Sequence, residues 1–161
     1  MTNKRLWAPW RIQYIKNFKK EKGCLFCRVF KSKQDAKNLV IFRSQNTLVM
    51  LNLYPYNNGH LMVAPIRHVA TLELLKPDEI ADLMQCVNKA KLLLDKTLKP
   101  EGYNIGCNVN RIAGAGFDQH LHIHIVPRWA GDTNFMTPLC NTRVISQSLH
   151  ELYEELSKNN K

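Results

Sequence analysis

The chain has 161 residues, which suffice for one well-packed domain, and we expect that single domain to span residues 1–161. Apolar residues make up 45% of the chain and charged residues 22%, a globular composition, and no apolar run approaches the roughly 20 residues that a membrane span needs. With 23 basic and 13 acidic side chains the formal net charge is +10. That charge favours a polyanionic partner such as a nucleotide polyphosphate, nucleic acid or a membrane surface, or it serves solubility alone.

The first 20 residues contain no acidic side chain, and residues 6–15 are rich in aromatic groups. This stretch is too aromatic for a mitochondrial presequence and lacks the apolar centre of a signal peptide, so we predict an ordered arm over residues 1–20 that packs on the domain. An odd count of five cysteines without a signal peptide indicates a reducing compartment, and we expect a cytoplasmic protein. Cys86 and Cys107 fall in helical and strand-like patterns and are expected to be packing residues.

Short apolar segments predict the first three strands, at residues 39–43, 47–52 and 60–65. The lysine-rich stretch 16–37 before them is expected to be a surface loop or a short helix. Residues 54–59 are rich in turn formers and separate the second strand from the third.

Pro77 is expected to begin a long helix, because Asp78 and Glu79 then lie in its first turn, where the helix dipole favours negative charge. Three-four spacing predicts one buried face made of Ile80, Leu83, Met84, Val87, Ala90 and Leu94. Strands at 103–108 and 120–126 and a second amphipathic helix over 145–156 follow. The order of elements predicts an α+β fold with an antiparallel sheet.

Three histidines, His120, His122 and His124, stand at alternate positions of the predicted strand 120–126. Alternate side chains of a strand share a face, so the three imidazoles would lie together while the intervening apolar residues pack on the core. The residues alone leave three interpretations open. One imidazole is a nucleophile oriented by its neighbours, or His120 and His122 chelate a metal, or the three form a structural cluster.

The pair Cys24 and Cys27 has the spacing of a zinc site but needs two further ligands. Candidates are His60, His68 and one histidine of the strand, and the alternative is two packed thiols. No thioredoxin-like pattern follows the pair, which argues against a redox role.

Polar residues around two loops are further candidates for binding. Asn57 and Asn58 are expected to shape the turn before His60, whereas Asn52 ends a strand and could bond a ribose hydroxyl. Gly114 and Gly116 lie in a loop whose amides could approach a phosphate, although the loop fits no P-loop or dinucleotide fingerprint. Aromatic side chains that could stack on a base, or simply pack in the core, are Trp7, Trp10, Tyr54 and Trp129.

The histidine pattern of residues 120–126 resembles that of the histidine triad superfamily of nucleotide hydrolases and transferases. Residues 52–63 resemble that superfamily's Asn…Pro-Gly-His strand, with Asn58 where proline is usual. Residues 6–11, 127–129 and 131–135 resemble a narrower branch that contains bacterial diadenosine tetraphosphate phosphorylases (ATP adenylyltransferases).

This resemblance implies a five-stranded antiparallel sheet with one long helix and a C-terminal helix, usually in a homodimer, with no organic cofactor. It implies that His122 attacks an α-phosphate to form a covalent nucleotidyl-histidine, and that His124 hydrogen-bonds near the nucleophile and the phosphate. Residues implied in substrate binding or support are Asn52 at the ribose, Asn108, Gly114 and Gly116 at the phosphates, Gln119 at the leaving group, and His60.

The resemblance also implies structural zinc held by Cys24, Cys27, His68 and His120, in the region 24–68 and the triad segment. The expected substrate is an adenine dinucleotide such as diadenosine tetraphosphate. Relatives often carry Ser or Gln in the loop before the triad, where this chain has Ala115 and Gly116, so the acceptor could be phosphate or water. The rival expectations are a hydrolase of AMP adducts, such as phosphoramidates or adenylated DNA ends, and a non-catalytic nucleotide-binding protein.

Overall fold

The structure is a computed structural model that describes residues 23–132 and 145–160. The predicted N-terminal arm with Trp7 and Trp10, and residues 133–135 of the branch-specific motif, lie outside the described residues.

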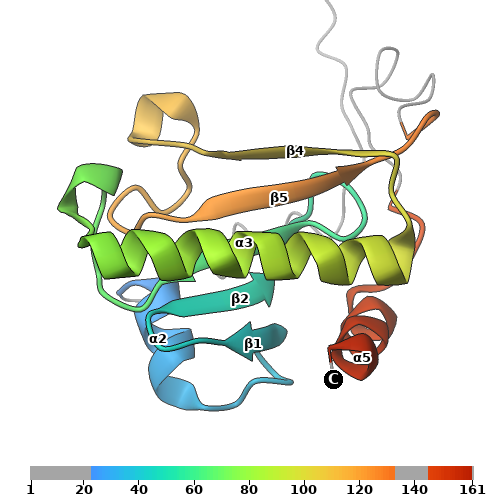
Figure 1. The fold of residues 1–161 in the computed structure, drawn as a ribbon, viewed down its shortest axis with the longest axis horizontal. Helices are drawn as coiled ribbons and strands as arrows, with labels where there is room; N and C mark the ends of the chain where they lie inside the picture. The colour runs from blue at the N-terminus through green and yellow to red at the C-terminus, as the bar shows by residue number, and fades with distance from the viewer. Residues whose placement is uncertain (1–22, 133–144, 161) are drawn as a thin grey trace, which may run out of the picture.

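The core of the fold is a five-stranded antiparallel sheet, as the resemblance implied (Figure 1). Its strands are β1 (Val40–Arg43), β2 (Thr47–Leu51), β3 (Leu61–Pro65), β4 (Gly102–Cys107) and β5 (Ile123–Arg128). Their spatial order is β1-β2-β3-β5-β4, so β5 lies between β3 and β4. That placement brings the triad segment beside the strand that follows His60.

The long helix α3 (Pro77–Leu98) lies across one face of the sheet, and α5 (Leu149–Asn159) packs beside it (Figure 1). Leu83, Val87, Ala90 and Leu94 face the core as predicted, together with Cys86 and Leu93. The prediction for Ile80 and Met84 was wrong, because these side chains are 43% and 47% exposed. The apolar stripe is wider than the strip of helix that the sheet covers. Neither α3 nor another helix of the described residues is apolar enough to cross a bilayer.

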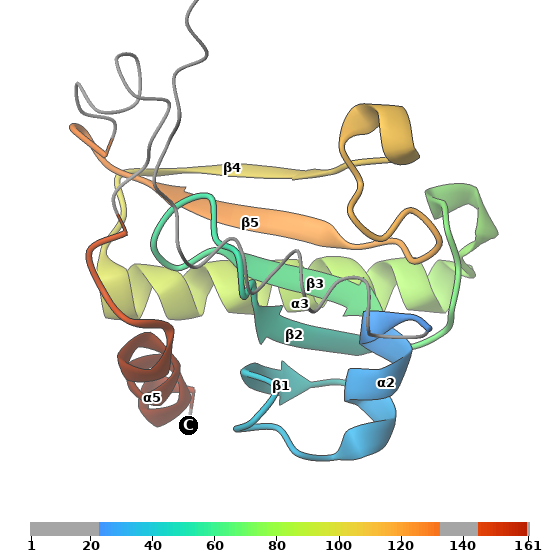
Figure 2. The ribbon, with the colours of Figure 1, turned by 180° about the vertical axis from the view of Figure 1, so that it is seen from behind.

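A second, smaller apolar layer lies on the opposite face, where α2 (Leu25–Ser32) packs on the β1–β2 side of the sheet (Figure 2). Phe26 and Val29 of α2 are buried against side chains of β1, β2 and β3, namely Val40, Leu48, Met50, Met62 and Ala64. The lysine-rich stretch therefore contains a short helix, and this helix lies on the face that carries the histidines.

The triad strand begins later than predicted, at Ile123 instead of residue 120. Pairing of β5 with β3 stops at Ile123 and Val63, because Pro65 has no amide hydrogen to continue the ladder. The Leu121 amide instead donates to the carbonyl of Val69, 2.6 Å away. The alternation of faces survives this break, since Leu121, Ile123 and Ile125 all lie in the core under α3.

Candidate active site

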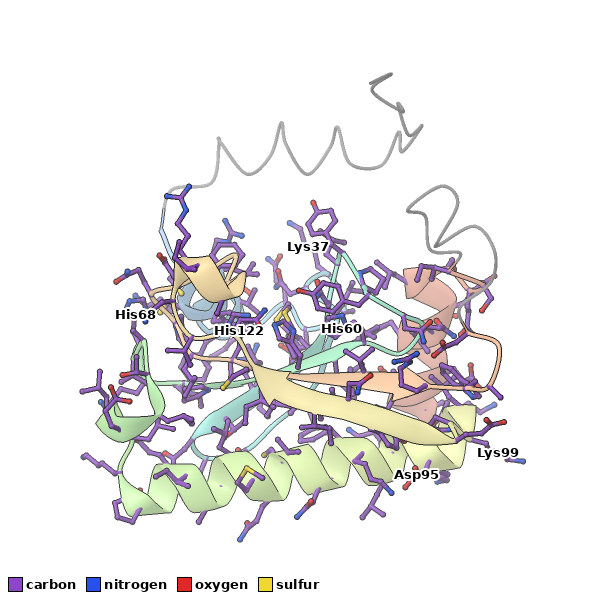
Figure 3. The ribbon with its side chains drawn as sticks, turned by 90° about the horizontal axis from the view of Figure 1, so that it is seen from above. Lys37, His60, His68, Asp95, Lys99 and His122 are labelled. Carbon is purple, nitrogen blue, oxygen red and sulfur yellow. The ribbon has the colours of Figure 1, made fainter. Side chains whose placement is uncertain are left out.

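The histidines form one continuous row on the face of the sheet opposite α3 (Figure 3). The ring of His68 lies 5.0 Å from that of His120, and the ring of His122 lies 4.8 Å from that of His124. His60, from the start of β3, closes the row at 5.0 Å from His124. Four of these five residues are buried, so each imidazole must find partners within the protein.

The tautomer of His122 follows from its one backbone partner. Its Nδ1 lies 2.9 Å from the carbonyl oxygen of His120, which can only accept a hydrogen bond. Nδ1 therefore carries the proton, and the lone pair of the neutral ring is on Nε2. Burial lowers the pKa of His122, although the bond to the carbonyl opposes this, so the ring is neutral at neutral pH. His122 thus presents an unprotonated Nε2.

The tautomer of His124 is fixed through His60. The Tyr56 amide donates to Nδ1 of His60 over 3.0 Å, so the proton of His60 is on Nε2. That Nε2–H donates to Nδ1 of His124 over 2.9 Å, which places the proton of His124 on its own Nε2. His124 is therefore a donor through its Nε2, and it lies beside His122, whose own Nε2 carries a lone pair.

Burial keeps this donor chain neutral. Burial and then the neighbouring rings of His124 and His122 lower the pKa of His60 to about 3. Burial and then His122 lower the pKa of His124 to about 4. Both rings stay uncharged well below neutral pH, so the tautomers are set by hydrogen bonds and not by charge.

At the other end of the row, four potential metal ligands from distant parts of the chain meet. One ligand atom from each of Cys24, Cys27, His68 and His120 lies within 4.8 Å of all the others. Nδ1 of His120 is 3.1 Å from Sγ of Cys24 and 3.1 Å from Nδ1 of His68. Sγ of Cys27 is 3.3 Å from Nδ1 of His68 and 3.7 Å from Nδ1 of His120.

These separations fit a tetrahedral zinc ion. Zinc binds sulfur at about 2.3 Å and nitrogen at about 2.0–2.1 Å, so neighbouring ligand atoms of a tetrahedron lie roughly 3.3–3.8 Å apart. The protonation of His120 fits as well, because its Nε2 lies 2.8 Å from the carbonyl oxygen of Pro65 and must donate to it. The lone pair of Nδ1 then faces the two thiols, as a metal-bound histidine requires.

The loop that carries His68 is held by an ion pair to α3. Arg67 donates to both carboxylate oxygens of Glu79, at 2.7 and 2.6 Å, and to the carbonyl oxygen of Leu74. Glu79 is 7% exposed and also accepts from the Lys76 amide at the helix N-terminus. Hydrogen bonds from Arg67 lower the pKa of Glu79 to about 2. The paired charges therefore fix the position of the loop next to the cluster.

The predicted substrate-binding residues lie in two places, around the turn before His60 and around the loop before His120. The Asn52 side chain accepts from the Tyr54 amide over 2.9 Å and lies 3.3 Å from Nδ1 of His60, so it shapes the turn and supports His60. The amide of Asn108 lies close to Gly114, whose φ of +90° suits glycine. Gly116 and Gln119 are exposed in the same loop. A cavity of about 340 Å³ opens there between Arg111, Ala115, Gly116 and Asp118.

The turn before His60 is anchored to both sides of the stretch 133–144. Asn57 donates to Asp132 over 2.8 Å and to the carbonyl oxygen of Pro127 over 3.0 Å. Asn58 donates to Gln147 over 3.1 Å. Within the turn the Asn58 amide donates to Oδ1 of Asn57 over 3.1 Å, so Asn57 shapes the turn as predicted, while the Asn58 side chain ties the turn to Gln147.

Two aromatic residues of the site had no signal in the sequence. The ring of Phe26 lies 5.0 Å from those of both His120 and His122. The ring of Tyr56 lies 4.6 Å from His60 and 5.6 Å from His124. Phe26 stands between the two cysteines and Tyr56 within a turn, so only the folded chain reveals that they flank the row.

Comparison with known proteins agrees with this architecture. A family model described as the HIT domain matches residues 33–131. The chain is 39% identical over 155 residues to an AP-4-A phosphorylase of Mycobacterium tuberculosis (strain ATCC 25618 / H37Rv), which covers 91% of this chain and 79% of that protein. It is 32% identical over 106 residues to the adenosine 5'-monophosphoramidase hnt1 of Schizosaccharomyces pombe, with 66% and 74% covered. A Zn-bound histidine triad family protein from Mycobacterium smegmatis superposes with a TM-score of 0.70 at 26% identity, over 86% of this chain and 93% of that one. The chain belongs to the HIT family.

Proposed function

We propose that this protein is a nucleotidyl hydrolase or transferase that cleaves diadenosine polyphosphates through a covalent nucleotidyl-histidine on His122. The observation that carries the proposal is the free Nε2 lone pair of His122 beside the Nε2–H donor of His124. A nucleophile and a donor in this arrangement suit attack on phosphorus, with charge developing on the phosphate oxygens. The net charge of +10 would attract such an anionic substrate.

In the first step, Nε2 of His122 forms a bond to the α-phosphorus, and the bond from phosphorus to the bridging oxygen breaks. The leaving nucleotide departs with the electron pair on that oxygen, which His124 stabilises by donating from Nε2. Positive charge develops on the His122 ring as it attacks, and the His120 carbonyl at Nδ1 stabilises that charge.

In the second step, an acceptor oxygen attacks the same phosphorus and restores His122. Phosphate as the acceptor gives a nucleoside diphosphate, whereas water gives AMP and releases a proton. The loop at Ala115 and Gly116 provides room but no hydroxyl for either acceptor.

We further propose that Cys24, Cys27, His68 and His120 hold a zinc ion. The supporting observation is that four ligand atoms from three separate parts of the chain lie within 4.8 Å of one another. Bound zinc would supply a structural cross-link, because four protein ligands leave no open position for chemistry. His120 then serves the metal, and its backbone carbonyl orients the nucleophile two residues later. The homodimer that the resemblance implies stays a prediction.

The decisive experiment is product analysis by anion-exchange chromatography after incubation with diadenosine tetraphosphate, with and without inorganic phosphate. We expect either ADP plus ATP that appear only with phosphate, or AMP plus ATP without it. If the parent protein retains radiolabelled adenylate through an acid-sensitive bond and the His122→Ala variant does not, the result would support the covalent step. If neither tube yields product, the proposal is wrong, and AMP phosphoramidates become the next substrates to test.

A further inference from the structure

A second cleft lies beside the histidine row, on the side of His60. It has a volume of about 370 Å³ and is lined by Pro55, Tyr56, Asn104, Val126 and Arg128. In Figure 3, His68, His122 and His60 follow one another along the sheet, and the cleft lies on the His60 side because the Tyr56 ring contacts His60 at 4.6 Å. Its volume is within the range of about 300–1,000 Å³ of small-molecule sites.

The cleft borders the proposed site of chemistry. Val126 and Arg128 follow His124 on the same face of β5, at intervals of two residues. On the neighbouring strand β4, Gly106 pairs with His124 and Asn104 pairs with Val126. A Cβ at Gly106 would meet no heavy atom of the described residues within 4 Å, so no side chain of β4 stands between His124 and Asn104. Tyr56 forms the other wall, with its ring 5.6 Å from that of His124.

The charge in the cleft is already balanced. Arg128 donates to both carboxylate oxygens of Asp132, at 2.6 and 3.0 Å, and to Oδ1 of Asn104 at 2.8 Å. A guanidinium bound in this way to a carboxylate is a poor site for a phosphate. Within the described residues, Nδ2 of Asn104 has no hydrogen-bond partner, so the Asn104 amide offers two N–H donors. The cleft therefore suits a neutral, planar, hydrogen-bond-accepting group.

We propose that this cleft binds the nucleoside of the leaving nucleotide, with the base against Tyr56 and its acceptor edge at Asn104. The inference rests on the proposed function. In-line displacement puts the leaving oxygen on the side of phosphorus away from His122. His124 follows His122 along the row toward Tyr56, so a leaving group directed along the row would reach the His124 donor and then the cleft. Recognition of a second nucleoside would make a dinucleoside polyphosphate a better substrate than a mononucleoside polyphosphate with the same scissile bond.

The test compares kcat/KM for diadenosine tetraphosphate with kcat/KM for adenosine tetraphosphate, whose leaving group is triphosphate alone. We expect the parent to prefer the dinucleotide, and we expect Tyr56→Ala and Asn104→Leu each to reduce that preference by about tenfold, as loss of base stacking or of a hydrogen bond commonly does. Leu92→Ala, an exposed apolar residue on α3 across the sheet, is the matched control and keeps the parent ratio.

Three outcomes would overturn the inference in distinguishable ways. A parent that cleaves both substrates with equal kcat/KM has no site for the second nucleoside. If the ratio of the two kcat/KM values stays at the parent value in both variants, the cleft does not bind the second nucleoside. An equal fall of kcat/KM on both substrates has the same meaning, because it leaves the ratio unchanged. A parent that cleaves neither substrate overturns the proposed function itself, and this inference with it.

Discussion

The two ends of the histidine row contain the same kind of residue in opposite roles. At one end the ring of His120 donates through Nε2 to a backbone carbonyl and turns Nδ1 toward two thiols and His68. At the other end His124 accepts a hydrogen bond at Nδ1 and carries its own proton on Nε2. His122, between them, has the reverse tautomer to His124.

This contrast shows that the partner of one ring nitrogen decides what the other nitrogen can do. Residue type and burial are nearly the same along the row, since His120, His122 and His124 are all 9% exposed or less. The difference comes from which carbonyl, amide or ring each one meets. The two ends of the row are separable by substitution, because different residues hold them.

The largest effect is expected for His122→Ala, which removes the proposed nucleophile. Turnover of diadenosine tetraphosphate should fall by roughly a thousandfold or more, because alanine cannot form the covalent intermediate. Zinc content should stay at the parent value. His150→Ala is the matched control, because the His150 side chain is 80% exposed on α5 and faces solvent. Activity of His122→Ala near that of the control would contradict the nucleophilic role.

The second effect concerns the other end of the row, where Cys24→Ser removes one proposed zinc ligand. Bound zinc, measured by elemental analysis, should fall from about one ion per chain to nearly none. The free energy of unfolding should fall by several kcal/mol, because loss of a structural metal is among the largest effects of a single substitution. Cys107→Ser, a thiol of β4 outside the cluster, serves as the control. Equal zinc in Cys24→Ser and in the parent would show that the four-ligand assignment is wrong.

A smaller effect is expected for His60→Phe, which keeps a ring but removes the donor to His124. The orientation of the His124 proton is then lost, and kcat should fall by roughly ten- to a hundredfold. Zinc content should not change, since His60 lies at the far end of the row. His60→Gln retains an N–H donor and an acceptor and should recover part of kcat. Equal kcat in the Phe and Gln variants would mean that His60 acts by packing alone.

The smallest effect is a dependence of stability on pH. The pKa values of His60 and His124 are lowered from 6.5 to about 3 and about 4. At pH values below 6.5 the unfolded chain therefore binds protons at these rings while the folded protein does not. Their contribution to the free energy of unfolding is fully present above pH 6.5 and is lost as the pH falls toward the folded-state pKa values. The slope is at most about 1.4 kcal/mol per pH unit for each proton.

Urea unfolding at several pH values between 7.5 and 5 would measure that slope. His60→Phe has one fewer titrating ring and should show a shallower slope than the parent. The metal ligands are present in both proteins, so their own pH dependence cancels in the comparison. Parallel slopes would show that His60 is not buried as a neutral ring.

Much of the fold was predictable from local patterns in the sequence. Alternation identified the strands and the two faces of the triad segment, and three-four spacing identified α3. Periodicity could not show where the sheet stops covering the helix, so Ile80 and Met84 were wrongly placed in the core. The start of β5 depends on Pro65 in another strand, which no local pattern reveals.

The site was predictable in part, and mainly through the family resemblance. Spacing alone identified Cys24 and Cys27 but left His60 and His68 as equal candidates for a metal. The fold separates them, because His60 bonds to His124 whereas His68 meets the thiols. Phe26 and Tyr56 were missed because their contacts join segments that are close only in the folded chain.

The anchoring of Asn57 to Asp132 and of Asn58 to Gln147 joins three segments of the chain at one turn. Asp132 follows β5 and Gln147 precedes α5, so the turn that leads to His60 holds the end of one element and the approach to another. Loss of either asparagine side chain would therefore lower the protection of both segments against local opening.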